Sequence, residues 1–413
     1  MVTFERFKLS NGLQTIFHYD PHTPMATISV LYDVGSKDEE PDKTGFTHLF
    51  EHLMFSGSKN APDFDGAMQS AGGDNNAYTN SDMTHFYNIL PAENLETALF
   101  LEADRMHNLI INEKTFETQR NVVIEEFMET CYNQPYGDLW HHLLDLTFTQ
   151  HPYRWPTIGL TPDHIANAQL EDVVKYYHSH YLPSNAILAI GGNFHSDQVR
   201  EIAEKYFGQI PAGVQPLRPG IVEPRQDGYR KKVIDADVPS DAIYLAFKMG
   251  ARNSSEYYPQ DLLTDILANG PSSRLISHLI KDESSFVSVD SYVYGSSEPG
   301  LLIIEGQPAE GIDLETAEEI LWKEINRLKK EDIPQEELDR QLNKVRTNLI
   351  LSETSSLGKT MSLAYYELLG NIDLINSEND RYQAVDPQDL KYHANKILNE
   401  DNCSMVGYRS ASS

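Results

Sequence analysis

The stretch "TGFTHLFEHLMFSG", residues 44–57, places two histidines and a glutamate inside an otherwise apolar segment. On a helix, His48, Glu51 and His52 lie at positions i, i+3 and i+4, so all three project from one face. The large apolar neighbours predict that this helix is mostly buried; they are Leu49, Phe50, Leu53, Met54 and Phe55. The trio therefore indicates a functional site built from groups that can bind a metal. The alternative is an accidental group on a solvated face.

The length and composition favour a soluble protein of two or more domains. The chain has 413 residues, 40% of them hydrophobic and 23% charged, which is typical of globular proteins and too long for one ordinary core. No run of about 18 or more apolar residues occurs, so we expect no membrane span. The N-terminus lacks a basic flank followed by an apolar core, so we expect a cytoplasmic protein, or a periplasmic one whose signal peptide has been removed.

The net charge and the cysteines argue against two further classes of protein, those that bind nucleic acid and those built on disulfides. A net charge of −29 makes nucleic acid an unexpected partner, because a phosphate backbone demands a basic surface. The simplest interpretation of this negative charge is that it keeps the protein soluble, and the alternative is a preference for cationic peptides or partners. Cys131 and Cys403 lie in opposite halves and outside any CxxC motif, so we expect no disulfide framework.

Three pairs of similar segments indicate an internal duplication. The segment "ATISVLYDVGSKDE" from Ala26 resembles "DAIYLAFKMGARNS" from Asp241, and "GFTHLFEHLMFSG" resembles "YPQDLLTDILANG". Likewise, "KYYHSHYLPSNAILAIGG" from Lys175 resembles "KYHANKILNEDNCSMVGY" from Lys391. Three matches in the same order favour a duplicated α+β unit.

The duplication predicts the domain boundaries. Residues 211–228 are rich in proline and glycine and interrupt all periodicity, so they predict a linker. We therefore expect an N-terminal domain over residues 1–210, which carries His48 and His52, and a homologous C-terminal domain over residues 229–413 that lacks this pair and binds no metal.

The second copy of the helix shows that folding does not require the trio. There, the positions of His48, Glu51 and His52 are taken by other residues while the apolar positions stay apolar; they are Asp261, Thr264 and Asp265. This difference favours a chemical role for the trio over a structural one.

The spacing of the trio suits a zinc peptidase. Two histidines one helical turn apart can bind a single Zn²⁺ through neutral imidazole nitrogens. Glu51 lies on the same face, where it can hold the water at an open coordination position and act as general base. The order H-x-x-E-H is the inverse of the commoner zinc protease motif.

A catalytic zinc needs a third protein ligand, and Glu126 is the strongest candidate. The segment "TFETQRNVVIEEFMETC", residues 115–131, predicts one long helix with an apolar stripe through Phe116, Val123 and Phe127, completed by Val122 and Glu126. Glu125 and Glu129 fall on the more polar side, which favours a solvated face. The alternative for Glu126 is a buried carboxylate paired with a basic side chain.

These residues resemble the superfamily of pitrilysin, insulin-degrading enzyme and the mitochondrial processing peptidases, and in particular its processing-peptidase β subunits. The resemblance extends to "AGGDNNAYTNSDMTHFY", residues 71–87, and "HPYRWPTIG", residues 151–159. It implies two homologous α/β-sandwich domains, each a mostly antiparallel sheet with helices on one face. It also implies zinc bound by His48, His52 and Glu126, with Glu51 as base, and an edge strand "DNNAYTN" that binds extended substrate at Asn76 and Ala77. Taken without the resemblance, the last two segments suit a glycine turn and a proline loop equally well.

The chain departs from the family pattern at two places. The family usually has a glutamate seven residues before the ligand glutamate, where this chain has Gln119, which can still hydrogen-bond in the second shell of the metal. Complete relatives also carry an arginine and a tyrosine that hold substrate, and those positions correspond to Ile280 and Val287.

We therefore predict a zinc endopeptidase subunit that hydrolyses unfolded peptides or short protein segments inside a two-chain chamber. The missing donors predict a heterodimer with a homologous chain that supplies the arginine and tyrosine. The alternative is a homodimer that uses other donors, such as backbone amides, His85 or Tyr87. Two rival functions stay open, a non-catalytic scaffold subunit and a peptide-binding protein that uses zinc only for structure.

Overall fold

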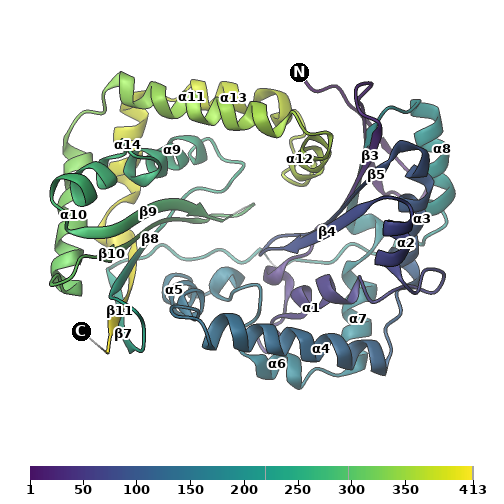
Figure 1. Cartoon of the computed structure of the whole chain (residues 1–413), viewed down its shortest axis with the longest axis horizontal. Helices are drawn as coiled ribbons and strands as arrows, with labels where there is room; N and C mark the ends of the chain where they lie inside the picture. Colours follow the sequence, from purple (N-terminus) through teal and green to yellow (C-terminus); the bar gives the residue numbers. More distant parts are fainter. Residues whose placement is uncertain (219, 296, 412–413) are drawn as a thin grey trace. The chain divides into compact units, whose positions relative to one another are not determined.

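The structure is a computed structural model that describes residues 1–218, 220–295 and 297–411. The chain forms two compact units (Figure 1). The first comprises residues 1–128, 155–220 and 350–377, and the second comprises residues 129–154, 221–349 and 378–413. Residues 211–218 and 220–228, in the predicted linker, carry neither helix nor strand.

The first unit is built on a six-stranded sheet in the order β1-β2-β6-β3-β5-β4. All neighbouring strands are antiparallel except β2 and β6, which are parallel. The strands are β1 (Glu5–Lys8), β2 (Gln14–Tyr19), β3 (Met25–Tyr32), β4 (Asp74–Thr79), β5 (Thr84–Pro91) and β6 (Ala186–Gly192). The helices that lie wholly in this unit are α1 (Phe46–Leu53), α2 (Phe64–Ser70), α3 (Leu95–Asn108), α4 (Glu113–Phe127), α6 (Pro162–Ala166), α7 (Leu170–His180), α8 (Ser196–Phe207) and α12 (Ser356–Leu368).

The second unit repeats this sheet with five strands in the order β7-β11-β8-β10-β9. Its parallel pair, β7 and β11, corresponds to β2 and β6, and the other pairs are again antiparallel. The strands are β7 (Arg230–Ala236), β8 (Ala242–Lys248), β9 (Phe286–Tyr294), β10 (Leu301–Pro308) and β11 (Cys403–Ser410). Its helices are α5 (Leu139–Thr147), α9 (Tyr257–Ala268), α10 (Leu314–Lys330) and α14 (Pro387–Ile397), while α11 (Gln335–Ser352) and α13 (Leu374–Gln383) cross the division between the units.

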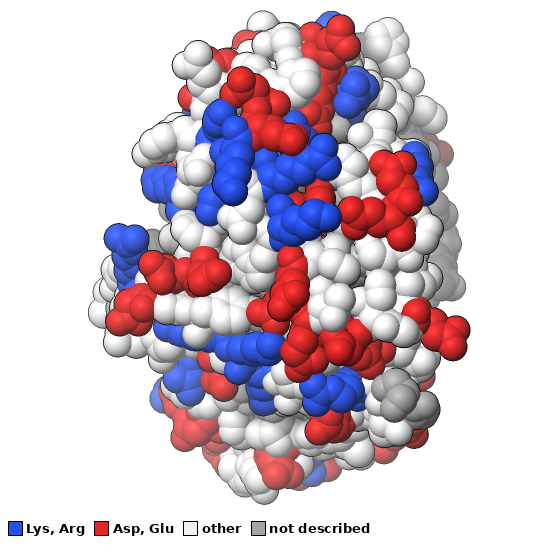
Figure 2. Space-filling view, turned by 90° about the vertical axis from the view of Figure 1, so that its left-hand side faces the viewer, with Lys and Arg blue, Asp and Glu red and all other residues white. Residues whose placement is uncertain are grey.

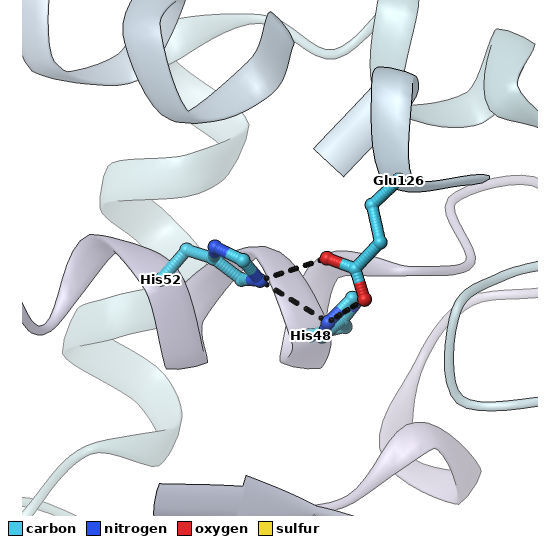
Figure 3. A group of neighbouring side chains, drawn as sticks. All are labelled: His48, His52 and Glu126. Carbon is cyan, nitrogen blue, oxygen red and sulfur yellow. Dashed lines mark hydrogen bonds and ion pairs between the residues drawn. The ribbon is translucent and has the colours of Figure 1, made fainter. Parts of the chain in front are cut away.

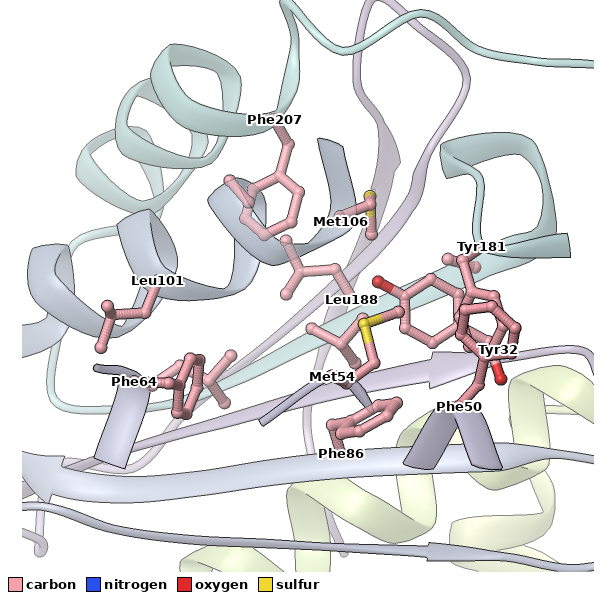
Figure 4. Packing of buried hydrophobic residues seen from close by; sticks show 14 of the residues in the cluster. Tyr32, Phe50, Met54, Phe64, Phe86, Leu101, Met106, Tyr181, Leu188 and Phe207 are labelled. Atoms are coloured by element: carbon pink, nitrogen blue, oxygen red, sulfur yellow. The ribbon is translucent and has the colours of Figure 1, made fainter. Parts of the chain in front are cut away.

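The matching strand order confirms the predicted α+β fold with two homologous, mostly antiparallel sandwiches. Side chains alternate between the faces of a strand, so the main core of the first unit takes Ile28 and Val30 from β3, while Leu31 points to the other face. Figure 4 shows part of that main core, where Phe50 of α1 lies near Tyr32 and Tyr181.

Helices also cover the second face of each sheet, so the prediction of helices on one face is wrong in this detail. In the first unit, Leu363 and Ala364 of α12 pack in one cluster with Leu31. In the second unit, Leu143 and Leu144 of α5 pack in one cluster with strand residues of that sheet. The segments 350–377 and 129–154 therefore belong to compact units other than those expected from the predicted boundaries at 210 and 229.

Charged side chains of both signs lie close together on the face drawn in Figure 2, which is typical of a solvated surface. In the described part of the chain, no helix is both long and apolar enough to cross a membrane.

Candidate metal centre

Helix α1 presents the predicted trio on the side opposite its buried stripe. Phe46, Leu49, Phe50 and Leu53 are at most 2% exposed, and burying each such side chain contributes roughly 1.5 to 3 kcal/mol to folding. The three polar side chains of the motif are half-buried. Packing thus fixes the helix while leaving one polar face accessible.

Helix α4 supplies Glu126 from a separate part of the sequence. The side chain of Asn112 caps this helix by accepting a hydrogen bond from the backbone N–H of Thr115 at 3.1 Å. The α-helix ends at Phe127, and a π-helical turn, Met128–Tyr132, follows it directly. The sequence predicted one helix over residues 115–131.

The predicted apolar stripe of α4 is confirmed at three positions and wrong at one. Phe116, Val123 and Phe127 are buried, but Val122 is 44% exposed. Val122 lies one residue before Val123, about 100° around the helix from the stripe. Glu126 lies at a similar angle beside Phe127, which is why its side chain is half-buried, at 39% exposure, and not fully enclosed.

The ligand-type atoms of His48, His52 and Glu126 converge (Figure 3). The two Nε2 atoms of the histidines are 3.2 Å apart. The Glu126 carboxylate lies 3.3 Å from Nε2 of His52 and 3.7 Å from Nε2 of His48. Among the described residues, this is the one group of three or more such side chains with ligand atoms within 4.8 Å of one another.

The electrostatics at His48 and Glu126 favour the protonation states that a metal needs. Burial lowers the pKa of His48, which favours the neutral imidazole, and Glu126 acts against this effect. The hydrogen bond from His52 lowers the pKa of Glu126, which favours the carboxylate. Nδ1 of His48 is buried without a hydrogen-bond partner among the described residues, whereas a metal-binding histidine usually donates from this second nitrogen.

The other acidic candidates stand outside this group. Glu51 is half-buried on α1 and is not one of the converging residues. Glu125 and Glu129 are exposed. Gln119 is half-buried on α4, seven residues before Glu126 and thus on the same face. The role of Glu51 as general base and that of Gln119 as a hydrogen-bond partner of a metal ligand remain predictions.

The end of the predicted family loop and the residues directly after it pack against the start of α1. Gly159 has a φ of 102°, and a Cβ on it would lie 3.0 Å from the backbone oxygen of Thr44. The hydroxyl of Thr44 accepts the backbone N–H of Leu160 at 2.8 Å and contacts Nδ1 of His164 at the same distance. The loop is therefore part of the support for α1.

The predicted edge strand is β4, which pairs with β5 on one side only. Asn76 is exposed and Ala77 is half-buried, and they pair with Tyr87 and Phe86 of β5. The free side of this strand can accept an additional strand. Substrate binding by Asn76 and Ala77 stays a prediction.

His85 cannot be the free donor that the homodimer alternative uses. The side chain is fully buried, and its ring nitrogens contact the hydroxyls of Ser29 and Tyr78. Burial lowers the pKa of His85 to about 3. Tyr87 is half-buried and keeps its hydroxyl as a possible donor.

The second unit has a structural polar cluster where the first has its trio. Asp261 accepts a hydrogen bond from the hydroxyl of Tyr382 at 2.6 Å, and burial raises the pKa of this carboxyl to about 6. Ile280 is half-buried and packs on the core of the unit, and Val287 is 67% exposed. Neither side chain carries a hydrogen-bond donor.

Family models match both halves of the chain. The model described as Insulinase (Peptidase family M16) matches residues 14–159, and the model described as Peptidase M16 inactive domain matches residues 167–345. The segment with His48 and His52 is thus similar to the insulinase model, and the later segment is similar to the inactive-domain model.

Individual relatives agree with these models over nearly the whole chain. A zinc protease, PqqE, from Helicobacter pylori is 30% identical, covering 97% of this chain and 92% of the relative. The mitochondrial-processing peptidase β subunit of Lentinula edodes is 26% identical, covering 97% and 88%. The crystal structure of a protease from Helicobacter pylori superposes with a TM-score of 0.93 at 28% identity, covering 99% of this chain and all of that one. The chain therefore belongs to peptidase family M16, the insulinase family.

Proposed function

We propose that this chain is the zinc-bearing subunit of an endopeptidase that acts on unfolded peptides or short protein segments. The observation that carries the proposal is the spacing of the three ligand-type atoms. Atoms that bind one tetrahedral zinc at about 2.0 to 2.1 Å lie about 3.3 Å from one another. The distances among His48, His52 and Glu126 are 3.2, 3.3 and 3.7 Å, so the group fits zinc with small adjustments.

The number of ligands supports a catalytic site over a structural one. Structural zinc sites are usually closed by four protein ligands, whereas catalytic sites have three and keep a position for water. Three side chains converge here within the described residues, which supports an open position. When bound, zinc polarises the scissile carbonyl and makes a water molecule more acidic.

The residues of this chain then have separate roles. His48, His52 and Glu126 hold the metal, and Glu51 takes a proton from the water and delivers it to the leaving amine. The free edge of β4, around Asn76 and Ala77, aligns an extended substrate through its backbone, which suits a peptidase that reads unfolded segments.

A homologous partner chain completes the site in this proposal. Stabilising a tetrahedral oxyanion needs positioned donors, and loss of one donor typically costs about 10²- to 10³-fold in rate. Ile280 and Val287 offer no donor, and His85 is engaged in the core. A heterodimer with a chain that carries arginine and tyrosine at the corresponding positions supplies them.

The test is cleavage of a quenched peptide library by the zinc-loaded chain, alone and with a co-expressed homologue that carries the two donors. We expect little cleavage by the chain alone and turnover near 1 to 10 s⁻¹, about the rate of an ordinary enzyme, with the partner. Full turnover by the chain alone would refute the heterodimer. Cleavage in neither case, with zinc bound, would favour the scaffold or structural-zinc alternatives.

A further inference from the structure

Glu39 is a buried residue outside the predicted site that contacts the helix bearing the histidines. The residue is only 6% exposed. Oε2 accepts the backbone N–H of Gly45 at 2.9 Å, and Oε1 accepts the backbone N–H of Thr47 at 2.8 Å. Such N–H groups at a helix start have no partner within the helix. Thr47 is followed directly by His48, so Glu39 holds the turn from which His48 projects.

The local sequence offers no other cap for α1. The residue at the cap position is Gly45, which has no side chain and a φ of 91°. A larger residue does not fit there, because a Cβ would lie 2.9 Å from the backbone oxygen of Ile158. The usual Ser, Thr, Asp or Asn cap is therefore replaced by a carboxyl group six residues earlier. Burial raises the pKa of this carboxyl group to about 8, and the backbone N–H groups of Thr47 and Gly45 act against that effect.

The turn before Glu39 contacts segments far along the chain. It follows the 3₁₀ turn Ser36–Asp38. The indole N–H of Trp155 donates to the backbone oxygen of Ser36 at 2.8 Å, and Arg218 donates to the carboxylate of Asp38 at 2.5 Å. The turn that leads into Glu39 is therefore held at two points by later parts of the chain.

We propose that Glu39 is a positioning residue of the metal centre, whose carboxyl group fixes the first turn of α1 so that His48 meets His52 and Glu126 at one point. This inference rests on the proposed zinc site. In a genuine zinc site, the metal–ligand distances match their standard values within about 0.2 Å. A small rotation of the first turn moves His48 away from the other two ligands by more than that.

The test compares zinc affinity in Glu39→Gln and Glu40→Gln. Glutamine keeps the size of Glu39 but has only one acceptor oxygen, so its NH₂ group faces one of the two backbone N–H groups. Glu40 is a matched control, because it is the next residue, exposed, with its nearest ion pair to Lys43 at 3.9 Å. In chelator competition we expect Glu39→Gln to bind zinc about 10- to 100-fold more weakly, as for other outer-shell changes. Glu40→Gln should stay within about twofold of the unaltered chain, as expected of a surface substitution.

A second readout separates positioning from stability. The Co²⁺-loaded Glu39→Gln protein should show shifted d–d absorption bands, which report the geometry of the ligands, while Glu40→Gln keeps the original bands. Circular dichroism of both metal-free variants establishes that they are folded. If Glu39→Gln does not fold, Glu39→Asp takes its place, since it keeps the carboxyl group but is shorter by one methylene.

Each outcome decides the matter. A folded Glu39→Gln or Glu39→Asp protein with zinc affinity and Co²⁺ bands equal to those of Glu40→Gln overturns the role of Glu39 and leaves the zinc site intact. Absence of zinc binding by the unaltered chain overturns the proposed function, and the role of Glu39 with it. Weaker binding with shifted bands supports the proposal.

Discussion

Replacing Glu126 by glutamine tests the third ligand of the proposed zinc site. The carboxylate lies 3.3 Å from Nε2 of His52 and 3.7 Å from Nε2 of His48, and its side chain is 39% exposed. The substitution removes the one negative charge among the three converging groups but leaves the packing of Phe127 and Val123 untouched. The metal-free protein should therefore fold with nearly unchanged stability, while zinc binding becomes much weaker.

The expected magnitude follows from the position of Glu126 among the converging atoms. Changes to residues that only contact a ligand cost about 10- to 100-fold in affinity, so loss of a ligand should cost at least about 100-fold. At a zinc concentration that is about 100 times the original Kd, bound zinc stabilises the fold by about 2.7 kcal/mol. Each kcal/mol shifts the Tm of a domain of about 150 to 250 residues by roughly 2 to 4 °C, so the zinc-dependent rise in Tm should shrink by roughly 5 to 10 °C.

The assay is thermal unfolding with and without zinc, combined with chelator competition, for Glu126→Gln and for Glu125→Gln. Glu125 is adjacent and exposed, so its substitution controls for the loss of charge on α4. Equal zinc affinities in the two variants would refute Glu126 as a ligand.

Three further substitutions have defined outcomes. Glu51→Gln should keep zinc bound and lower turnover by about 10²- to 10⁴-fold, measured as peptide cleavage beside metal content; loss of zinc would make Glu51 a ligand instead of a base. Burial raises the pKa of Glu223, but N–H groups of His151, Gln150 and Thr149 outweigh it and lower the pKa from 4.5 to about 2. The ionised carboxylate thus stabilises the fold above about pH 4.5 and ceases to do so as the pH falls towards 2. The Tm of Glu223→Gln should therefore lie below that of the unaltered chain at pH 7, and the difference should shrink in acid. A difference in Tm that does not depend on pH would contradict this. Gly159→Ala should lower the stability by about 1 to 3 kcal/mol because of its positive φ and the close backbone oxygen, and an unchanged denaturant midpoint would contradict this.

The fold could be predicted from periodicity and repetition up to the level of elements and sheets. The alternation of Ala26 to Tyr32 and its echo from Asp241 gave matching central strands, β3 and β8, because side-chain period follows directly from backbone geometry. The placement of α5 and α12 could not be predicted in the same way. An apolar stripe such as Leu139, Leu143 and Leu144 shows that a helix is buried on one side, but it does not identify which sheet it covers.

The candidate site shows the same limit at the level of single residues. The trio on α1 could be located because its members are neighbours on one helix face, and Glu126 because it borders an apolar stripe. Val122 was assigned to that stripe wrongly, because adjacent helical positions differ by about 100° and Val122 therefore lies off the stripe that contains Val123. Glu126 is likewise at the border of the stripe, so only one side of it is buried. Glu39 was missed because its contacts are to backbone N–H groups, which carry no sequence signal, and the nearby glycine gave the one indirect clue, an uncapped helix start.

The most direct test of the zinc centre is the anomalous difference map of a zinc-loaded crystal, recorded on both sides of the zinc absorption edge. We expect one strong peak about 2.0 to 2.2 Å from Nε2 of His48, Nε2 of His52 and a carboxylate oxygen of Glu126, with no fourth protein ligand. A peak at another place, or a peak closed by four protein side chains, would contradict a catalytic zinc site in this chain.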